Sequence, residues 1–331
     1  MQPTVLEICA GAGGQALGLE AAGFELVSAI EVDHHACNTL RQNRPAWNIF
    51  EGSISDFDGS DYQGVDLLAG GVPCPPFSIA GRQLGHADER NLFPEAIRLV
   101  REARPRAVML ENVPGFASER FENYRRRLFR EFSRLGYESQ SQVLNASWFG
   151  VPQLRPRFVL VAFRGAIPDS FVWPMAFAAP ARSVGDTLFD LMSSRSWRGA
   201  SKWRVKASGI APTLVGGSKK HGGPDLGPTR ARKQWAALGV DGLGIADEPP
   251  GPDFGISHIP RLTVRMAARL QAFPDSWAFC GGKTAAYRQV GNAFPPPVAQ
   301  AVGQAIQYAL RGKMPQRRGT QSRLFQMTAH A

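Results

Sequence analysis

Short apolar runs alternate with helical patterns along the first half of the chain. The strand-like runs cover 4–9, 26–31, 65–69, 107–110 and 157–163, and the helical patterns cover 15–22, 35–42, 93–103 and 121–135. Short apolar runs suit buried strands, and strands that alternate with helices suit parallel βαβ units. This order predicts an α/β fold with a doubly wound, mainly parallel sheet.

The pattern changes after Arg164. From about 168 to 260 the chain is rich in Gly and Pro and shows little helical period, whereas helical patterns return at 262–270 and 297–310. Gly and Pro interrupt regular elements, so this stretch indicates a second, smaller and irregular domain. We expect one domain from 1–165 and 273–313, a second from 166–272, and a flexible tail at 314–331.

Composition narrows the class of protein. The chain has 331 residues, of which 44% are hydrophobic, enough for packed cores. No apolar run approaches the ~18 residues that a membrane span needs, and no signal-type segment opens the chain. The cysteines Cys9, Cys37, Cys74 and Cys280 stand singly, which indicates neither a zinc site nor a disulfide framework. We expect a cytoplasmic protein without metal.

The positive charge of the chain is concentrated in the irregular region. The formal net charge is +10, and ten basic residues lie between Arg195 and Trp235 against one acid, Asp225. Trp197 and Trp203 lie among them. Cations interleaved with aromatic rings are typical of a face that binds a polyanion. A basic loop that is merely solvated is the alternative.

A cysteine and a glutamate follow two of the predicted strands. Cys74 lies in GGVPCPPFS at 70–78, after the run 65–69, and Glu111 follows the run 107–110. Because the carboxyl ends of parallel strands meet at one edge of a sheet, we expect this thiol and this carboxyl to converge where such sheets bind ligands. The pair indicates nucleophilic catalysis assisted by an acid.

A glycine-rich turn follows the first strand. The turn GAGG at 11–14 precedes a helix, and Glu31 lies 20 residues after Gly11 at the end of the second predicted strand. Such an acid can bind ribose hydroxyls, so the spacing suits an adenosine cofactor, although a simple tight turn is the alternative. Because the turn is GAGG and not GxGxxG, S-adenosylmethionine suits it better than a dinucleotide that carries a pyrophosphate. A cysteine nucleophile beside a methyl donor suits methylation at carbon 5 of a pyrimidine, which needs a thiolate at carbon 6.

With these motifs the chain resembles the DNA (cytosine-5) methyltransferase family. The matching stretches are VLEICAGAGG (5–14), IEVD (30–33), GGVPCPPFSIAGRQ (70–83), NLF (91–93), ENVPGF (111–116), VPQLRPRFVLVAF (151–163), RLTVRMAARLQAFPDSW (261–277) and YRQVGNAFPPPVAQAV (287–302). The resemblance implies a Rossmann-like, S-adenosylmethionine-dependent fold, with 1–165 catalytic and cofactor-binding and 166–272 the target-recognition domain.

The resemblance implies catalytic roles for five residues. Cys74 would be the nucleophile, and Glu111 would act at ring nitrogen 3 of the cytosine. Asn112 would support the nucleophile loop, Arg157 would donate to oxygen 2 of the base, and Arg155 would lie nearby. The target base would leave the duplex stack, because carbon 6 is inaccessible within it.

Cofactor contacts are also implied by the resemblance. The residues are Cys9, Ala10, Gly11, Gly13, Gly14, Glu31, Val32, Ile54, Leu92, Asn292 and Ala293. Two positions depart from the family pattern. Ser53 stands where an aspartate often contacts the adenine amine, and Asp56 is the candidate to replace it. Met266 replaces a common glutamate, which we expect to affect domain packing more than chemistry.

The expected partner is duplex DNA. The DNA contacts would be Ser78, Arg82, Thr213, Leu214, Lys219, Lys220, Arg230 and Arg232. We expect a monomeric, site-specific DNA methyltransferase, either the modification enzyme beside a separate restriction endonuclease or a solitary methylase. A transfer-RNA cytosine-5 methyltransferase and a non-catalytic DNA-binding regulator are the alternatives. The recognition sequence and the base that removes the carbon 5 proton are not readable from the residues.

Overall fold

The computed structural model describes residues 2–73, 91–216 and 225–312. Within them the chain divides into two compact units by internal contacts. Unit 1 comprises the described parts of Met1–Leu144, Pro156–Pro174 and Val298–Met314. Unit 2 comprises the described parts of Asn145–Arg155 and Met175–Pro297. No helix in the described residues is long and apolar enough to cross a membrane.

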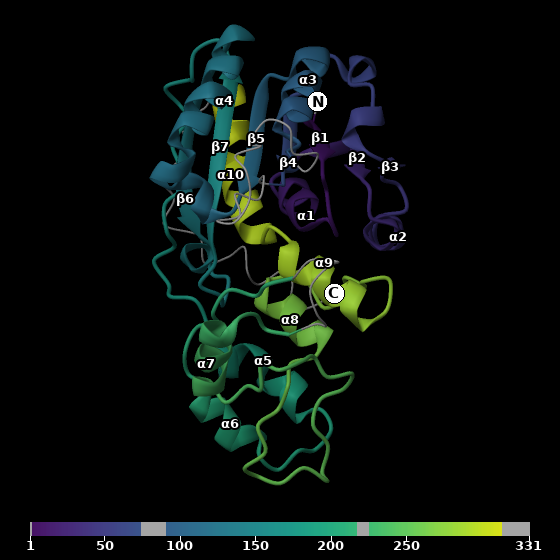
Figure 1. Ribbon diagram of the computed structural model, residues 1–331, viewed down its shortest axis with the longest axis vertical. Helices are drawn as coiled ribbons and strands as arrows, with labels where there is room; N and C mark the ends of the chain where they lie inside the picture. The colour runs from purple at the N-terminus through teal and green to yellow at the C-terminus, as the bar shows by residue number, and fades with distance from the viewer. Residues whose placement is uncertain (1, 74–90, 217–224, 313–331) are drawn as a thin grey trace. The chain divides into compact units, whose positions relative to one another are not determined.

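Unit 1 is built on a sheet with the strand order β3-β2-β1-β4-β5-β7-β6 (Figure 1). The strands are β1 (Thr4–Ile8), β2 (Glu25–Glu31), β3 (Ile49–Glu51), β4 (Leu67–Gly71), β5 (Ala107–Asn112), β6 (Tyr137–Asn145) and β7 (Pro156–Arg164). The strands from β3 to β5 are parallel to their neighbours, and β7 is antiparallel to β5. The α/β fold with a mainly parallel sheet is therefore confirmed.

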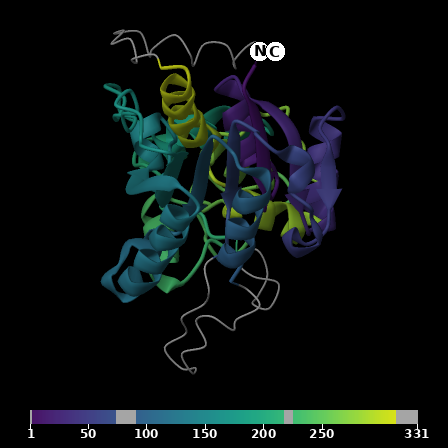
Figure 2. The same cartoon turned by 90° about the horizontal axis from the view of Figure 1, so that it is seen from above.

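Helices cover the sheet on both faces. They are α1 (Gly14–Ala21), α2 (His34–Asn43), α3 (Phe93–Ala103), α4 (Glu122–Arg134) and α10 (Pro296–Leu310). Apolar residues of α3 and α4 join Leu6, Ile8 and Leu68 in one core cluster, and Figure 2 shows α10 on the other side of the sheet from these two helices. The predicted helix 93–103 is observed with the same bounds.

The order of the strands creates a switch point between β1 and β4. The chain continues from β1 to β2 on one side of β1, whereas β4 and β5 lie on the other side. Gly70 allows these two central strands to approach closely, because a Cβ at this position would lie 2.4 Å from Ile8 Cγ1. Ligands of open α/β sheets bind at such a point, outside the carboxyl ends of the strands.

Unit 2 contains more helix than the sequence predicts. Its helices are α5 (Val184–Ser193), α6 (Ala200–Lys206), α7 (Thr229–Ala237), α8 (Val264–Leu270) and α9 (Lys283–Asn292). The sequence from 168 to 260 shows little helical period, yet α5, α6 and α7 lie in this stretch. These helices have seven to ten residues each, too short for a clear period between Gly and Pro.

Candidate active site

Glu111 lies at the carboxyl end of β5, next to the end of β4. The register pairs Gly71 with Glu111, and a Cβ at Gly71 would lie 3.3 Å from Glu111 Oε2. Gly71 therefore leaves room for this carboxylate. Glu111 is buried, with 9% of its surface exposed. A carboxyl buried in this way is largely shielded from water, and a ligand would reach it from the carboxyl edge of the sheet.

Arg157 approaches the same carboxylate from β7. Because β7 runs antiparallel to β5, the start of β7 meets the end of β5. Arg157 Nε lies 2.7 Å from Glu111 Oε1, and about a tenth of each side chain is exposed. Burial lowers the pKa of Arg157, and the Glu111 carboxylate opposes this shift. The structure thus brings together the predicted acid and the predicted donor to oxygen 2.

Asn112 anchors the chain that leads to Cys74. Its Nδ2 donates to Val72 O at 2.8 Å, and its Oδ1 accepts from Val113 N at 2.8 Å. Val72 lies two residues before Cys74, so β5 holds the backbone where the nucleophile segment begins. Cys74 itself, with Ser78 and Arg82, lies outside the described residues.

Glu31 is fixed at the carboxyl end of β2 by three backbone amides. Gly11 N donates to Oε2 at 2.7 Å, while Val32 N and Asp33 N donate to Oε1 at 2.9 Å and 2.7 Å. A carboxylate has about four lone-pair sites, so Oε2 keeps capacity for a further donor. This geometry suits one ribose hydroxyl. The bond from Gly11 N also joins the turn after β1 to the end of β2, the two segments whose spacing of 20 residues suggested an adenosine cofactor.

The turn after β1 is shaped for close backbone approach. Gly11 and Gly13 have φ of 55° and 83°, and a Cβ at Gly11 would meet no atom within 4 Å. Gly13 is the N-cap of α1, which begins at Gly14, and Ala10 N donates to Ile30 O at 3.1 Å. The turn therefore leaves open space at Gly11, whose amide is bonded to Glu31.

Cys9 precedes this turn and is not an activated thiol. Burial raises the pKa of Cys9 to about 12, and the negative charge of Glu31 adds to the shift. Its φ of 52° lies in the left-handed region. A thiol with such a pKa stays protonated at neutral pH. Cys9 can therefore line the cofactor site but has no nucleophilic role.

The apolar residues predicted to contact the cofactor differ in their exposure. Val32 is 71% exposed, whereas Ile54 is buried in the core cluster that Leu92 packs against. Ser53 is the N-cap of the short 3-10 helix η1 (Ile54–Asp56), where its hydroxyl accepts from Ser55 N at 3.3 Å. Asp56, at the end of η1, is exposed and stays the candidate acid for the adenine amine.

Arg155 lies in unit 2 and is fully buried. Its guanidinium donates to Leu214 O at 2.7 Å, to Gly291 O at 2.7 Å and to Ala293 O at 2.9 Å. These contacts make it a clamp on backbone carbonyls, and they give no support to the expected place of Arg155 beside the base. Sequence reasoning missed this clamp because the spacing of two arginines does not show which acceptors each one meets.

The clamp holds two predicted ligand-binding segments of unit 2. Leu214 is 1% exposed, and its amide donates to Gln153 Oε1 at 2.9 Å. Its side chain is core, so the expected DNA contact of this element falls to Thr213, whose hydroxyl donates to Leu154 O at 2.6 Å. Asn292 and Ala293 are the predicted contacts for the methionine end of the cofactor. They directly follow Gly291, whose carbonyl accepts from Arg155.

Glycines let the strap of residues 211–216 lie directly on the end of α9. A Cβ at Gly216 would lie 2.4 Å from Asn292 Oδ1, and a Cβ at Gly291 would lie 2.4 Å from Gly216 Cα. Both contacts are possible only without side chains. The strap and the end of α9 therefore form one fixed piece.

The tryptophans of the basic region are not part of an exposed face. Trp197, Trp203 and Trp235 are 3%, 4% and 0% exposed, so the expectation of rings interleaved with cations on a surface is wrong. Sequence composition cannot distinguish a buried ring from an exposed one in a short amphipathic helix. The described cations of this region are exposed or partly exposed: Arg195, Arg198, Lys202, Arg204, Lys206, Arg230, Arg232 and Lys233.

Two of these cations are used in ion pairs within unit 2. Arg195 pairs with Glu248, and Arg204 pairs with Asp186 at 2.7 Å. Arg230 and Arg232, both predicted to bind DNA, lie on α7, and Arg232 Nη2 is 3.5 Å from Thr229 Oγ1. Lys219 and Lys220 lie outside the described residues.

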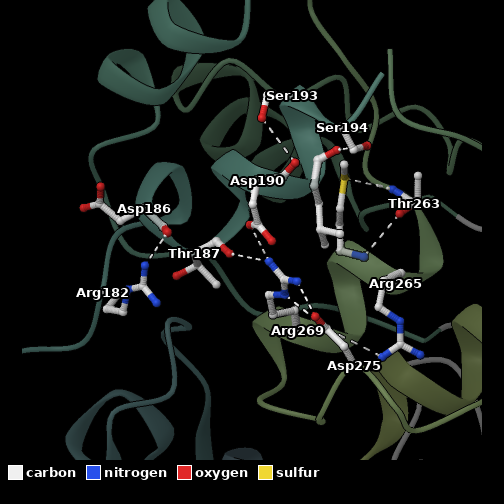
Figure 3. A network of polar contacts seen from close by, with 12 residues as sticks. Arg182, Asp186, Thr187, Asp190, Ser193, Ser194, Thr263, Arg265, Arg269 and Asp275 are labelled. Atoms are coloured by element: carbon white, nitrogen blue, oxygen red, sulfur yellow. Dashed lines mark hydrogen bonds and ion pairs between the residues drawn. The ribbon is translucent and has the colours of Figure 1, made fainter. Parts of the chain in front are cut away.

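A polar network connects α5 with α8 (Figure 3). Arg269 of α8 donates to Thr187 O at 3.2 Å, pairs with Asp190 at 2.5 Å, and pairs with Asp275. At the start of α8, Thr263 Oγ1 accepts from Met266 N and Met266 Sδ accepts from Thr263 N at 3.5 Å. Met266 thus completes the capping box of α8 with sulfur where a carboxylate or amide is usual.

Metal ligation finds no support in the described part of the chain. Within residues 2–73, 91–216 and 225–312, no group of three or more His, Cys, Asp and Glu side chains is placed to hold a metal ion.

Comparison with known proteins agrees with this geometry. The chain is 53% identical to the Type II methyltransferase M.NgoMIV of Neisseria gonorrhoeae over 94% of this chain and 99% of the relative. It is also 53% identical to the Type II methyltransferase M.NaeI of Lentzea aerocolonigenes, over 92% of this chain and 75% of the relative.

Solved structures share the fold. One is a putative DNA modification methyltransferase from a prophage of E. coli, with a TM-score of 0.65, 24% identity and coverage of 93% of this chain and 99% of that one. Another is DNMT2 of Spodoptera frugiperda, with a TM-score of 0.64, 18% identity and coverage of 92% and 99%. Residues 3–308 match the C-5 cytosine-specific DNA methylase family, and the chain belongs to this family of DNA cytosine-5 methyltransferases.

Proposed function

We propose that the protein methylates carbon 5 of cytosine at specific sites in duplex DNA through a covalent adduct of Cys74 with a flipped base. The observation that carries this proposal is the buried pair of Glu111 and Arg157, which lies 2.7 Å apart at the edge where the chain leads to Cys74. A carboxyl and a guanidinium fixed side by side suit ring nitrogen 3 and oxygen 2 of one cytosine.

Each residue then has a defined part in the reaction. The Cys74 thiolate forms a bond to carbon 6, while Glu111 supplies a proton to nitrogen 3, so that carbon 5 becomes nucleophilic. Arg157 holds oxygen 2. After methyl transfer, the carbon 5 proton leaves to a base, for which water is our candidate, the bond from sulfur to carbon 6 breaks, and the nitrogen 3 proton returns to Glu111.

S-adenosylmethionine would supply the methyl group. Glu31 would bind a ribose hydroxyl through Oε2, Gly11 would give the ligand room, and Ile54 and Leu92 would flank the adenine. Asn292 and Ala293, which belong to unit 2, are proposed to bind the methionine end of the cofactor. Target recognition is assigned to the region 166–272, and Thr213, Arg230 and Arg232 are the proposed DNA contacts that lie within the described residues.

A trapping experiment tests this function. Duplex DNA that carries 5-fluorocytosine should form a stable adduct with the wild type in the presence of S-adenosylmethionine, because fluorine cannot leave carbon 5 as a proton does. Cys74→Ala should form none, while Cys280→Ala, which changes another unpaired cysteine, should react like the wild type. No adduct with the wild type, or an adduct with Cys74→Ala, would overturn the proposal.

The site preference and the biological role need a second experiment. The two relatives that are 53% identical are named Type II methyltransferases, which supports a modification enzyme that acts beside a restriction endonuclease. Bisulfite sequencing of a sequence-diverse plasmid treated with the protein should show 5-methylcytosine at one short sequence. Methylation of purified transfer RNA without methylation of the plasmid would instead favour the RNA alternative.

A further inference from the structure

A single arginine of α3 holds the turn that carries Ile54. Arg98 Nη2 donates to Ile54 O at 2.6 Å and Arg98 Nη1 donates to Phe57 O at 3.1 Å. These two carbonyls lie at the start of η1 and directly after it, so one guanidinium fixes both ends of the turn. All of these groups lie in unit 1.

Two glutamates of the same helix orient this guanidinium. Arg98 Nε lies 2.7 Å from Glu95 Oε2, and Arg98 Nη1 lies 2.7 Å from Glu102 Oε2. Glu102 Oε2 also accepts from Gly59 N at 3.0 Å. The helix therefore grips residues 54–59 at three backbone points. The side chains of Arg98 and Glu102 are 27% exposed and that of Glu95 is 32% exposed, so the charges are only partly screened by water.

The same helix begins at a second proposed cofactor contact. Leu92 is the N-cap of α3, and it is a partly buried residue that packs against the apolar cluster containing Ile54. Ile54 lies in η1 and Leu92 lies at the start of α3, so the position of Ile54 relative to Leu92 depends on the bonds between η1 and α3. Arg98 donates to two of the three backbone points at which α3 holds this turn.

We propose that Arg98 is a positioning residue for the adenine of the methyl donor, which holds Ile54 at the correct distance from Leu92. The inference rests on the proposed function, since that function assigns both apolar side chains to the cofactor. Arg98 touches neither DNA nor the reacting atoms. Its loss weakens cofactor binding and leaves the chemical step intact once the cofactor is bound.

The test is Arg98→Met, which keeps the apolar stem and removes every donor. We expect KM for S-adenosylmethionine and Kd for S-adenosylhomocysteine to rise about tenfold, as for the loss of charge-assisted hydrogen bonds, with kcat at saturating cofactor within about twofold. The Kd for adenosine should rise by the same factor, because adenosine retains the adenine and lacks the methionine end. Arg98→Lys should recover part of the affinity.

Arg106→Met is the matched control for fold stability. Arg106 pairs with Asp66 at 2.8 Å and donates to Leu310 O at 2.7 Å, before the start of β5 and thus at the opposite end of the strand from Glu111. It should lower the melting temperature without changing KM. An Arg98→Met protein with an unchanged KM, or with a lower kcat alone, would overturn the inference. Failure of the wild type to bind S-adenosylhomocysteine would overturn the proposed function instead.

Discussion

Replacing Glu7 by glutamine should stabilise the protein at neutral pH. Glu7 lies in the middle of β1, paired with Ala29 and Ala69, and is 0% exposed. Burial raises the pKa of Glu7 well above 4.5, the nearby Ala16 amide opposes this shift, and the negative charge of Glu31 adds to it. Neither carboxyl oxygen has a partner of good hydrogen-bond geometry. The folded protein therefore keeps this carboxyl protonated to a higher pH than the unfolded chain does.

The sign of the pH dependence follows from the raised pKa. Below pH 4.5 both states are protonated, so Glu7 has no ionisation cost. As the pH rises above 4.5, the unfolded chain gains free energy by ionising and the folded protein does not, so stability is lost. The loss is at most about 1.4 kcal/mol per pH unit, which gives a ceiling of about 3 kcal/mol at pH 7. Glutamine has the same size and cannot ionise.

Urea unfolding of Glu7→Gln and wild type between pH 5 and pH 8 measures this effect. The difference in free energy of unfolding should be small at pH 5 and should grow in favour of the variant up to the pKa of the folded carboxyl. Glu25→Gln, at an exposed position of β2, should give a difference that does not change in this way. A Glu7→Gln variant less stable than wild type at pH 7, or a difference independent of pH, would refute the reasoning.

Three further predictions concern packing and reactivity. Gly291→Ala should lower the free energy of unfolding, measured by thermal unfolding, by about 1–3 kcal/mol, as expected for overpacking. The reason is that its Cβ would lie 2.4 Å from the backbone of the strap. The control Gly282→Ala, whose Cβ would meet no atom within 4 Å, should have little effect in the same assay. Met266→Leu removes the sulfur acceptor of the Thr263 amide and should cost about 1 kcal/mol in urea unfolding, whereas equal stability would show that the sulfur bond contributes nothing. Burial raises the pKa of Cys37 to about 12, so iodoacetamide at pH 8 should leave it unlabelled in native protein, as measured by mass spectrometry; labelling as fast as in urea would contradict this.

The strands and the main site residues were accessible from the sequence because each depends on local chemistry. The apolar runs predict β1, β4, β5 and β7, and the order of parallel strands then places Glu111 at the carboxyl edge, as observed. The spacing from Gly11 to Glu31 is matched by a bond of 2.7 Å. Strand β6 was missed because it lies at the edge of the sheet, where the polar sequence YESQSQVLN has no apolar run.

The remaining features depend on tertiary contacts that residue types do not encode. Arg155 and Arg157 stand two positions apart in one motif, yet the first binds carbonyls of unit 2 and the second binds Glu111. Likewise, Trp203 contributes a buried ring whose Nε1 donates to Gly239 O at 2.9 Å, although its neighbours in the sequence are exposed cations. Spacing along the chain identified the candidates but could not choose their partners.

The reversed direction of β7 changes where polar side chains must be sought in a sheet of this kind. For a parallel strand, the functional side chain lies at the carboxyl end, as Glu111 does after the apolar part of β5. For β7, which runs antiparallel to β5, the same edge receives the opening residues, and Arg157 is the second residue of the strand. A search for ligand-binding groups in a mixed sheet should therefore cover the last residues of the parallel strands and the first residues of a strand antiparallel to them.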